Sequence, residues 1–386
     1  MKKKLLFING HLNTGGVEKS LLDVLKYLDY DRYEVDLLLL EELGDYTPEL
    51  PEQVNVRLMS LKNTYGPVWK ALLRCVRQGD WFCLRMRLVF LAMKFFGQKQ
   101  IRWAGSLLTG KKHYHCAIGF RPGICSQIAA FATDADRRIT WWHHGEITVD
   151  RQEYGEMASA CHRVVSVSHV CRTMLEEAFP QLADKLVVIP NVADVENIRE
   201  KALAFEPYGS EQGFRIVSVG RLAPEKHFEN AIRCAAALKE RGIPFCWHLV
   251  GDGVERSRLE TLAEELGVTD RFVFEGNQPN PYPFLKGADL FVHPSYVESF
   301  GIVILEALAL GVPCVAAKSA GACELLEHET NGLLAEKTPE ALCEKVTVLL
   351  EDTELYQCLK SSAVCPEKYS ADAVAEMINC LLEESE

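Results

Sequence analysis

Short apolar runs alternate with helical patterns from one end of the chain to the other. Each run has the length of a buried strand, and most are followed by residues in which apolar side chains recur at the helical period. Parallel strands joined by crossover helices produce this alternation, so the sequence predicts an α/β fold. The predicted strands are residues 5–9, 35–40, 116–120, 139–143, 164–167, 215–220, 245–250, 272–275, 290–293 and 314–317.

The predicted strands form two sets. Between them, the stretch 194–213 is polar and has no strand pattern, which indicates a hinge region. A chain of 386 residues with 48% apolar content is long enough for two packed cores. We therefore expect two doubly wound, Rossmann-like domains that face each other across a cleft. The predicted domains are residues 1–195 and 196–368, and a final helix in residues 369–386 packs back on the first domain.

Charge is distributed unevenly along the chain. The net charge of −12 argues against general affinity for nucleic acid. The segment 68–112, however, holds ten Lys or Arg against the single acid Asp80, so it carries +9 and the remainder carries −21. This segment is either a solvated helix face or an amphipathic surface that docks on anionic membrane lipids. We favour docking, because Lys70, Arg74 and Arg77 share one helix face and aromatic residues lie between the cations.

The cysteines and the first residues of the chain indicate where in the cell the protein is located. None of the fourteen cysteines forms the Cys-x-x-Cys pair of a zinc ribbon or redox site, which favours reduced thiols in a cytoplasmic protein. The first apolar run ends at Asn9, too soon for an export signal. No apolar stretch approaches the roughly 20 residues that a membrane-spanning helix needs. We expect a cytoplasmic protein at the inner face of the cytoplasmic membrane.

The most informative motif contains Glu298 and Glu306. A helix has about 3.6 residues per turn, so two residues eight apart do not share one face. The sequence instead predicts a loop at Glu298, a turn at Phe300 and Gly301, and a helix from about Ile302 that carries Glu306. The free N–H groups and positive dipole end of such a helix start favour a phosphate. Glu306 is then placed to accept hydrogen bonds from both hydroxyls of a ribose.

Two acidic residues beside a phosphate require cations nearby. Arg221 and Lys226 supply them, directly after the predicted strand 215–220. Ligands of doubly wound sheets bind at the carboxyl ends of strands, and this is where both motifs lie. A diphosphate, a ribose and a sugar together make a nucleotide sugar, which we predict to be the ligand.

The ordered motifs resemble one known family. Gly15-Gly16-Val17-Glu18, Trp142-His143-His144-Gly145, Val167-Ser168, Ile189-Pro190-Asn191, Gly220-Arg221 with Glu225-Lys226, and the Glu298 to Glu306 motif follow one another as in the retaining GT-B glycosyltransferases of family 4. Each piece by itself is weak, but the ordered set is specific. The resemblance covers nearly the whole chain, weakly in residues 48–115 and strongly from residue 139 onward. It implies transfer of a hexose from a nucleotide diphosphate to an acceptor, with retention at the anomeric carbon.

The resemblance also implies roles for particular residues. The implied catalytic residues are His144, Arg221, Lys226 and Glu298, with the two cations stabilising the leaving diphosphate. No residue is an obvious covalent nucleophile, and neither a metal nor a cofactor is required. The family's first domain binds the acceptor. The implied donor-binding residues are Gly16, Gly220, Arg221, Lys226, Glu298, Phe300, Gly301 and Glu306.

Several other motifs have simpler interpretations. Gly251-Asp252-Gly253 is typical of a turn at a strand end, and so is Gly15-Gly16 when taken alone. Asp134-Ala135-Asp136 has the Asp-x-Asp pattern of metal-dependent transferases, but turn propensity favours a surface turn. His113 and His115 are too sparse for a zinc site. His143 and His144 are adjacent, so on a strand they face opposite ways, one toward the core and one toward the site.

The functional prediction is a retaining hexosyltransferase that serves surface polysaccharide or glycolipid synthesis. Family frequency favours a UDP-sugar donor, and the acceptor is a saccharide or a lipid-linked sugar. A nucleotide-sugar epimerase or a phosphorylase of the same fold remains an alternative, as does a non-catalytic nucleotide-sugar-binding scaffold at the membrane surface. A dehydrogenase is less consistent, because the closely spaced three-glycine fingerprint does not follow the first strand.

Overall fold

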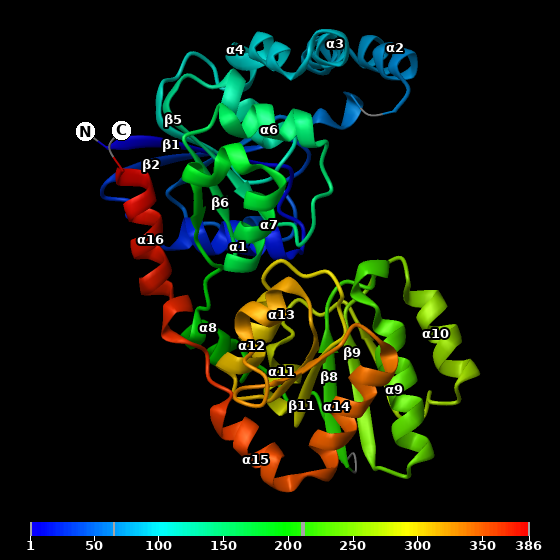
Figure 1. The fold of residues 1–386 in the computed structure, drawn as a ribbon. Coiled ribbons are helices and arrows are strands. Elements are labelled where there is room, and N and C mark those ends of the chain that lie inside the picture. The colour runs from blue at the N-terminus through cyan, green and yellow to red at the C-terminus, as the bar shows by residue number, and fades with distance from the viewer. Residues whose placement is uncertain (1, 65, 210–212, 385–386) are drawn as a thin grey trace. The chain divides into compact units, whose positions relative to one another are not determined.

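The computed structural model describes residues 2–64, 66–209 and 213–384, with the side chain of Lys62 left out (Figure 1). The chain forms two compact units. Unit 1 comprises residues 1–190 and 375–386, and unit 2 comprises residues 191–374. Each unit has its own parallel β-sheet with helices packed against it, which confirms the predicted α/β class. The predicted cleft concerns how the units are placed relative to each other and stays a prediction.

The sheet of unit 1 has seven parallel strands in the order β3-β2-β1-β4-β5-β6-β7. Because β1 has β2 on one side and β4 on the other, the strand order reverses between β1 and β4, and the loops after these strands diverge there. The five strands predicted in this part of the chain are present, and β3 and β7 are additional. The strands are β1 Lys3–Asn9, β2 Tyr33–Leu39, β3 Val54–Leu58, β4 Tyr114–Gly119, β5 Ala135–Trp142, β6 Arg163–Ser166 and β7 Leu186–Val188.

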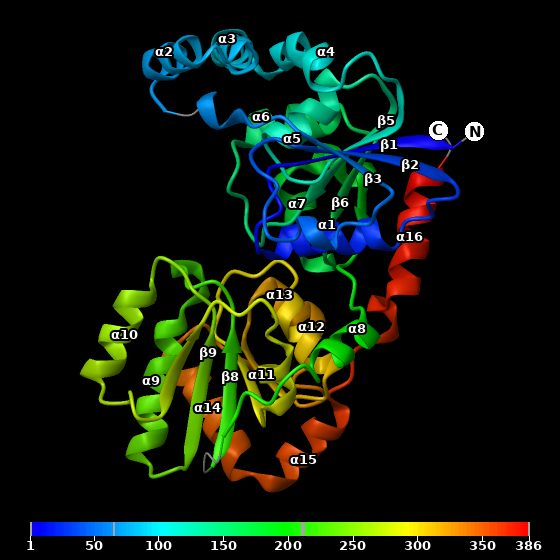
Figure 2. The ribbon, with the colours of Figure 1, turned by 180° about the vertical axis from the view of Figure 1, so that it is seen from behind.

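Helices complete unit 1. Apolar residues of β1 and β4, such as Leu6, Ile8 and Tyr114, pack with Met86 and Val89 of α3 in one core cluster. The basic segment folds into helices, and α2, α3 and α4 follow one another along one border of the unit (Figure 2). The helices are α1 Gly16–Lys26, α2 Val68–Gln78, α3 Trp81–Phe96, α4 Gly105–Leu108, α5 Ile124–Gln127, α6 Arg151–Ser159 and α7 His169–Ala178.

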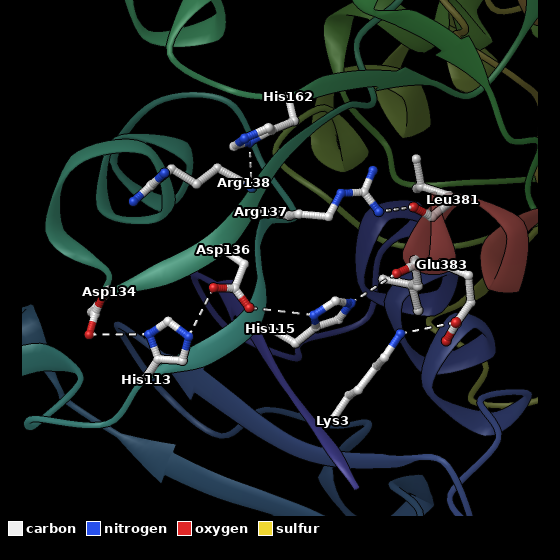
Figure 3. Close-up of polar contacts among 11 residues, drawn as sticks. Lys3, His113, His115, Asp134, Asp136, Arg137, Arg138, His162, Leu381 and Glu383 are labelled. Atoms are coloured by element: carbon white, nitrogen blue, oxygen red, sulfur yellow. Dashed lines mark hydrogen bonds and ion pairs between the residues drawn. The ribbon is translucent and has the colours of Figure 1, made fainter. Parts of the chain in front are cut away.

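The last helix, α16 (Ala371–Glu383), is fixed to unit 1 at its carboxyl end (Figure 3). Arg137 of β5 donates a hydrogen bond of 2.6 Å to the carbonyl of Leu381, and a ring nitrogen of His115 in β4 lies 3.2 Å from the carbonyl of Leu382. Lys3 of β1 pairs with Glu383 at 3.0 Å. These contacts satisfy carbonyls that have no partner within a helix and place cations where the helix dipole favours them.

The Asp-x-Asp motif is not the surface turn that the sequence favoured. Asp136 lies within β5, and Asp134 directly precedes that strand. His113 contacts Asp134 at 3.3 Å and Asp136 at 3.0 Å, and His115 contacts Asp136 at 3.6 Å (Figure 3). Strand pairing between β4 and β5 brings these side chains together, which turn propensity does not take into account. In the described part of the chain, no group of three or more His, Cys, Asp or Glu side chains is arranged to hold a metal ion.

The sheet of unit 2 has six parallel strands in the order β10-β9-β8-β11-β12-β13, and its order reverses between β8 and β11. The five strands predicted here are present, and β13 is additional. The strands are β8 Phe214–Val219, β9 Phe245–Val250, β10 Phe272–Gly276, β11 Leu290–His293, β12 Cys314–Ala317 and β13 Leu333–Ala335. The helices are α8 Val195–Lys201, α9 Phe228–Glu240, α10 Arg256–Glu265, α11 Tyr282–Gly287, α12 Ile302–Ala309, α13 Ala320–Leu325, α14 Pro339–Glu351 and α15 Thr353–Ser362.

The stretch predicted as a hinge begins with a helix. Asp194 caps α8 by accepting a hydrogen bond of 3.2 Å from the backbone N–H of Asn197. Only Ile198 of this seven-residue helix is buried, so the helix has too few apolar positions to show a period in the sequence. None of the helices within the described ranges is both long and apolar enough to cross a membrane.

Candidate functional site

The strand order of unit 2 brings Lys226 and Glu298 together. Lys226 lies in the loop after β8, and Glu298 lies in the loop after β11, on the two sides of the point where the order reverses. The Lys226 Nζ is 2.5 Å from the Glu298 Oε2, and the His293 Nε2 is 3.4 Å from the same oxygen. Ser295 also donates a hydrogen bond of 3.3 Å to the carbonyl of Glu225, which ties the two loops together.

Charge in this cluster is set by burial and by the ion pair. Burial acts to raise the pKa of Glu298, but the charge of Lys226 and the contact with His293 outweigh burial and lower the pKa to about 2. Burial lowers the pKa of His293, and Glu298 opposes this shift only in part. Glu298 is therefore an anion at neutral pH. It holds the ammonium group of Lys226 at the carboxyl edge of the sheet.

The turn after Glu298 starts α12, as the sequence predicts. Gly301 has φ of 84°, a left-handed conformation that favours glycine, and it directly precedes the first residue of the helix. Phe300 is buried and packs edge-on against Tyr369 with 5.4 Å between the ring centroids. A Cβ added to Gly321 would lie 2.4 Å from the carbonyl carbon of Phe300, so a glycine is needed where α13 meets this turn. Nothing in our sequence analysis pointed to Gly321.

Glu306 lies in the second turn of α12. Its side chain is buried, and the hydroxyl of Tyr282 donates a hydrogen bond of 3.1 Å to its Oε1. Polar contacts such as this one offset the cost of burying a carboxylate. Carboxylate oxygens are also the acceptors that a hydroxyl-bearing ligand requires.

Arg221 differs from Lys226 in its surroundings. Its side chain is 72% exposed and pairs with Glu225 at 2.9 Å, an ion pair between residues four apart. Such exposed pairs contribute roughly 0–1 kcal/mol. A guanidinium held this weakly can turn to an incoming phosphate, which it binds in a bidentate manner.

Glycines allow the loops after β8 and β9 to lie against each other. A Cβ on Gly251 would be 1.9 Å from the carbonyl oxygen of Gly220, and a Cβ on Gly253 would be 2.3 Å from that of Leu222. The backbone N–H of Leu222 donates a hydrogen bond of 2.9 Å to the carbonyl of Asp252. The Gly251-Asp252-Gly253 segment is therefore more than the strand-end turn that the sequence indicated, because it also supports the loop that carries Arg221.

Unit 1 has its own polar cluster at the carboxyl edge of its sheet. Gly16 is the first residue of α1 and is exposed, and Glu18 in the first turn is buried. Arg121, which follows β4, places its Nη2 2.6 Å from the Glu18 Oε1, and the Nδ1 of His11 is 3.7 Å from the same oxygen. The pair spans the point where the strand order of unit 1 reverses. We did not predict Arg121, although its place in Phe120-Arg121-Pro122-Gly123 after a strand was a signal.

The two adjacent histidines have different surroundings. His143 is buried, with its ring centroid 4.8 Å from that of Phe120 and nearly parallel to the ring of Trp141. Burial lowers its pKa to about 3. Its Nε2 has no hydrogen-bond partner among the described residues. His144 is exposed at the surface, but the surrounding protein partly desolvates its ring, and this desolvation and the nearby Arg121 lower its pKa. The structure thus places His143 in the core and His144 at the surface.

Comparison with known proteins shows which family the part of the chain around this site resembles. Residues 200–364, which lie within unit 2 and contain the Lys226 and Glu298 cluster, match the family model described as glycosyl transferases group 1. This part of the chain is thus similar to the group 1 glycosyltransferases.

Curated relatives that match parts of this chain come from bacteria and archaea. A stretch of 123 residues is 40% identical to a lipopolysaccharide core biosynthesis glycosyltransferase, LpsD, of Rhizobium meliloti, and covers 32% of this chain and 35% of that protein. A stretch of 240 residues is 32% identical to an uncharacterized glycosyltransferase of Methanocaldococcus jannaschii, and covers 59% of this chain and 61% of that protein. The chain thus spans between about a third and two thirds of the length of these two curated relatives.

A solved structure matches both units. The Anabaena protein HepE, crystallised with UDP and glucose, has a TM-score of 0.73 and 23% identity, and the match covers 99% of this chain and 100% of that chain. At this identity the likeness supports the fold alone. The fold is GT-B, with one Rossmann-like sheet in each unit.

Proposed function

We propose that this protein is a glycosyltransferase that takes a hexose from a UDP-sugar, with retention at the anomeric carbon and without a metal ion. One observation carries the proposal. A partly buried Lys226–Glu298 pair, the buried carboxylate of Glu306 and the start of α12 lie at the carboxyl edge of the unit 2 sheet, within the part that matches the group 1 family. A cation, a helix start and two carboxylates suit a nucleotide diphosphate linked to a sugar.

The proposed roles follow from the chemistry of each group. Lys226 and Arg221 bind the diphosphate and stabilise the charge that develops on it as the sugar leaves. Backbone N–H groups at Phe300 and Gly301 contact the donor, as does the loop at Gly220. Glu306 binds the ribose hydroxyls, and Glu298 binds hydroxyls of the donor sugar while it holds Lys226 in place.

Two residues of unit 1, His144 and Gly16, also have proposed roles. His144 acts beside the reacting sugar. Its lowered pKa keeps the imidazole neutral at physiological pH, so it can accept a hydrogen bond from a hydroxyl. We also propose that Gly16 contacts the donor, a role that the resemblance to the family 4 glycosyltransferases implies.

The acceptor is proposed to be a saccharide or a lipid-linked sugar of a surface polysaccharide or glycolipid. The named function of the Rhizobium relative, in lipopolysaccharide core biosynthesis, supports this class. We also propose that helices α2 and α3 dock unit 1 on the inner face of the cytoplasmic membrane. Their excess of cations over acids supports this, because each cation near an anionic surface contributes about 1 kcal/mol.

Thermal unfolding with UDP, GDP, ADP and NAD tests the donor site. A ligand at a hundred times its dissociation constant stabilises the folded state by about 2.7 kcal/mol, which shifts the midpoint measurably. We expect a shift with UDP that Lys226→Ala and Glu306→Ala abolish. Lys239→Ala is the matched control, because Lys239 also pairs with an acid, Asp270 at 2.6 Å, but far along α9 from the cluster. No shift with any nucleotide would contradict the proposal.

Release of UDP from UDP-glucose tests transfer itself. A transferase releases UDP quickly only when an acceptor is present, whereas an epimerase converts the sugar without any acceptor. We expect release that depends on added lipid-linked saccharide. We also expect Glu298→Gln to slow release at saturating donor. Binding of UDP without release under any condition would favour a non-catalytic scaffold.

A further inference from the structure

Unit 1 contains an apolar cavity of about 300 Å³ next to its polar cluster. The walls come from four places in the sequence: the chain after β2, the chain after β3, α5 after β4, and the inner side of α3. Most of the lining is aliphatic or aromatic, which is typical of small-molecule sites. The lining residues are Leu40, Glu41, Leu61, Phe90, Met93, Ile124 and Gln127.

The polar end of the cavity adjoins the cluster at the sheet edge. Glu41 lines the cavity and also lies beside Gly10, where its Oε1 and the Nη1 of Arg121 are the nearest side-chain atoms to the space of a Cβ, at 3.5 and 3.6 Å. The side-chain nitrogen of Gln127 already donates a hydrogen bond of 2.6 Å to Glu153, so we assign Gln127 no contact with a ligand. A guest in the cavity therefore meets apolar walls along its length. It meets a carboxylate and a guanidinium at one end.

The helix that walls the cavity also forms an unusual surface. On α3, Phe90 and Met93 line the cavity, while Phe95 and Phe96 are 73% and 72% exposed. α2 exposes Trp69 in the same way. The cations of the two helices are largely exposed as well, and α3 and α2 lie side by side at the border of unit 1 (Figure 2). Exposed aromatic rings among cations are typical of a surface that lies in an anionic membrane interface.

From this continuity we propose that the cavity holds the hydrocarbon chain of a membrane-borne acceptor. The chain leaves the bilayer along α3 and lies between Phe90, Met93 and Ile124. The sugar at its head then lies at Glu41, whose carboxylate accepts hydrogen bonds from sugar hydroxyls. This inference deepens the proposed function and rests on it, because it selects a lipid-linked acceptor over a free saccharide.

Fluorescence of cis-parinaric acid, a polyene fatty acid, tests the cavity in the full-length protein. We expect saturable enhancement with the wild type and at least tenfold weaker binding by Ile124→Trp, since the larger ring fills the space. Leu88→Trp is the matched control, because Leu88 lies on α3 but is 54% exposed. It should bind the probe as the wild type does. Met93→Trp is a second filling variant, should Ile124→Trp fail to fold.

Two further measurements separate this inference from the proposed function. The UDP-induced thermal shift should be unchanged in both filling variants, because the donor cluster lies in unit 2. Transfer to an acceptor with a long hydrocarbon chain should fall at least tenfold in those variants, while transfer to the same saccharide without its chain should not. Equal binding of the probe by wild type and both filling variants would overturn the cavity. If UDP does not shift the unfolding midpoint of the wild type, the proposed donor site is wrong instead.

Discussion

Contacts with three other residues hold Glu298 in place. Its Oε2 contacts Lys226 and His293, and its backbone carbonyl accepts a hydrogen bond of 2.7 Å from Gly321. A side chain held on both its carboxylate and its backbone has little freedom. It can therefore present a fixed acceptor to a ligand without a large loss of entropy on binding.

Glu298→Gln should destabilise unit 2 in a pH-dependent manner. The pKa of Glu298 falls from an ordinary 4.5 to about 2 in the folded protein. The resulting stabilisation is complete above about pH 4.5 and is lost as the pH falls toward 2. A shift of this size corresponds to about 3 kcal/mol. Urea unfolding should therefore show a gap of that order between wild type and variant near pH 7, and a gap less than about half as large near pH 3.

Glu34→Gln provides the control for that measurement. Glu34 pairs with Lys4 at 3.8 Å, and both side chains are about half exposed. Its loss should cost less than about 1 kcal/mol at any pH. A constant gap between wild type and Glu298→Gln across the acid range would show that the ion pair does not account for the stability.

Gly251→Ala should cost more than backbone strain alone explains. The new Cβ would lie 1.9 Å from the carbonyl oxygen of Gly220, so the loop that carries Arg221 must move. We expect a loss of about 2–3 kcal/mol and weaker UDP binding. Gly242→Ala is the control, because Gly242 has φ of 72° but, apart from its chain neighbours, no described residue comes within 4 Å of the added Cβ. It should cost only about 1 kcal/mol and leave UDP binding intact. Equal losses in both variants would contradict the proposed contact.

At the scale of elements, the strands that the sequence predicted are the buried apolar ones. β9, β11 and β12 have the predicted bounds, because each is a buried, mainly apolar run flanked by Pro, Gly or charged residues. The strands that the sequence did not reveal, β3, β7 and β13, lie at sheet edges. β7 and β13 have only three residues, and β3 alternates polar and apolar residues over five. Their pairing is decided by a neighbouring strand that is already in place.

The end of α16 depends on Arg137, which donates to the carbonyl of Leu381 and pairs with Glu384 at 3.2 Å. Hydrogen bonds from a charged donor contribute roughly 1.5–3 kcal/mol each. Arg137→Met should therefore speed amide exchange in the last turns of α16 about tenfold or more. Arg138→Met is the matched control, because Arg138 is adjacent on β5 and no hydrogen bond or ion pair among the described residues joins its side chain to α16 (Figure 3). Unchanged exchange in Arg137→Met would contradict this account of the anchor.

At the scale of the whole molecule, the two units share one architecture but differ in their chemistry. Each has a parallel sheet whose strand order reverses next to its first strand, and each has an ion pair across that reversal. In unit 2 the pair lies beside a helix start and a buried carboxylate. In unit 1 it lies beside an apolar cavity. A polar nucleotide suits the first arrangement, and an amphipathic molecule suits the second.

Hydrogen exchange with UDP should reflect this difference. All the proposed donor residues except Gly16 lie in unit 2. We therefore expect UDP to slow exchange in residues 220–226 and 298–306, where the cluster and the start of α12 lie. Strands β2 and β3 of unit 1 should be unaffected and serve as the internal control. Absence of protection in residues 298–306 would contradict the proposed donor site.

The sequence by itself determined the fold class, the two sets of strands and the local structure around Glu298. These depend on interactions between near neighbours, such as apolar periodicity and the left-handed turn at Gly301. Only the tertiary structure decided which charges meet. Lys226 is 72 residues from Glu298 in the sequence, and Arg121 is 103 residues from Glu18. Strand order brings each pair together, and packing of the whole sheet sets that order, which no local pattern contains.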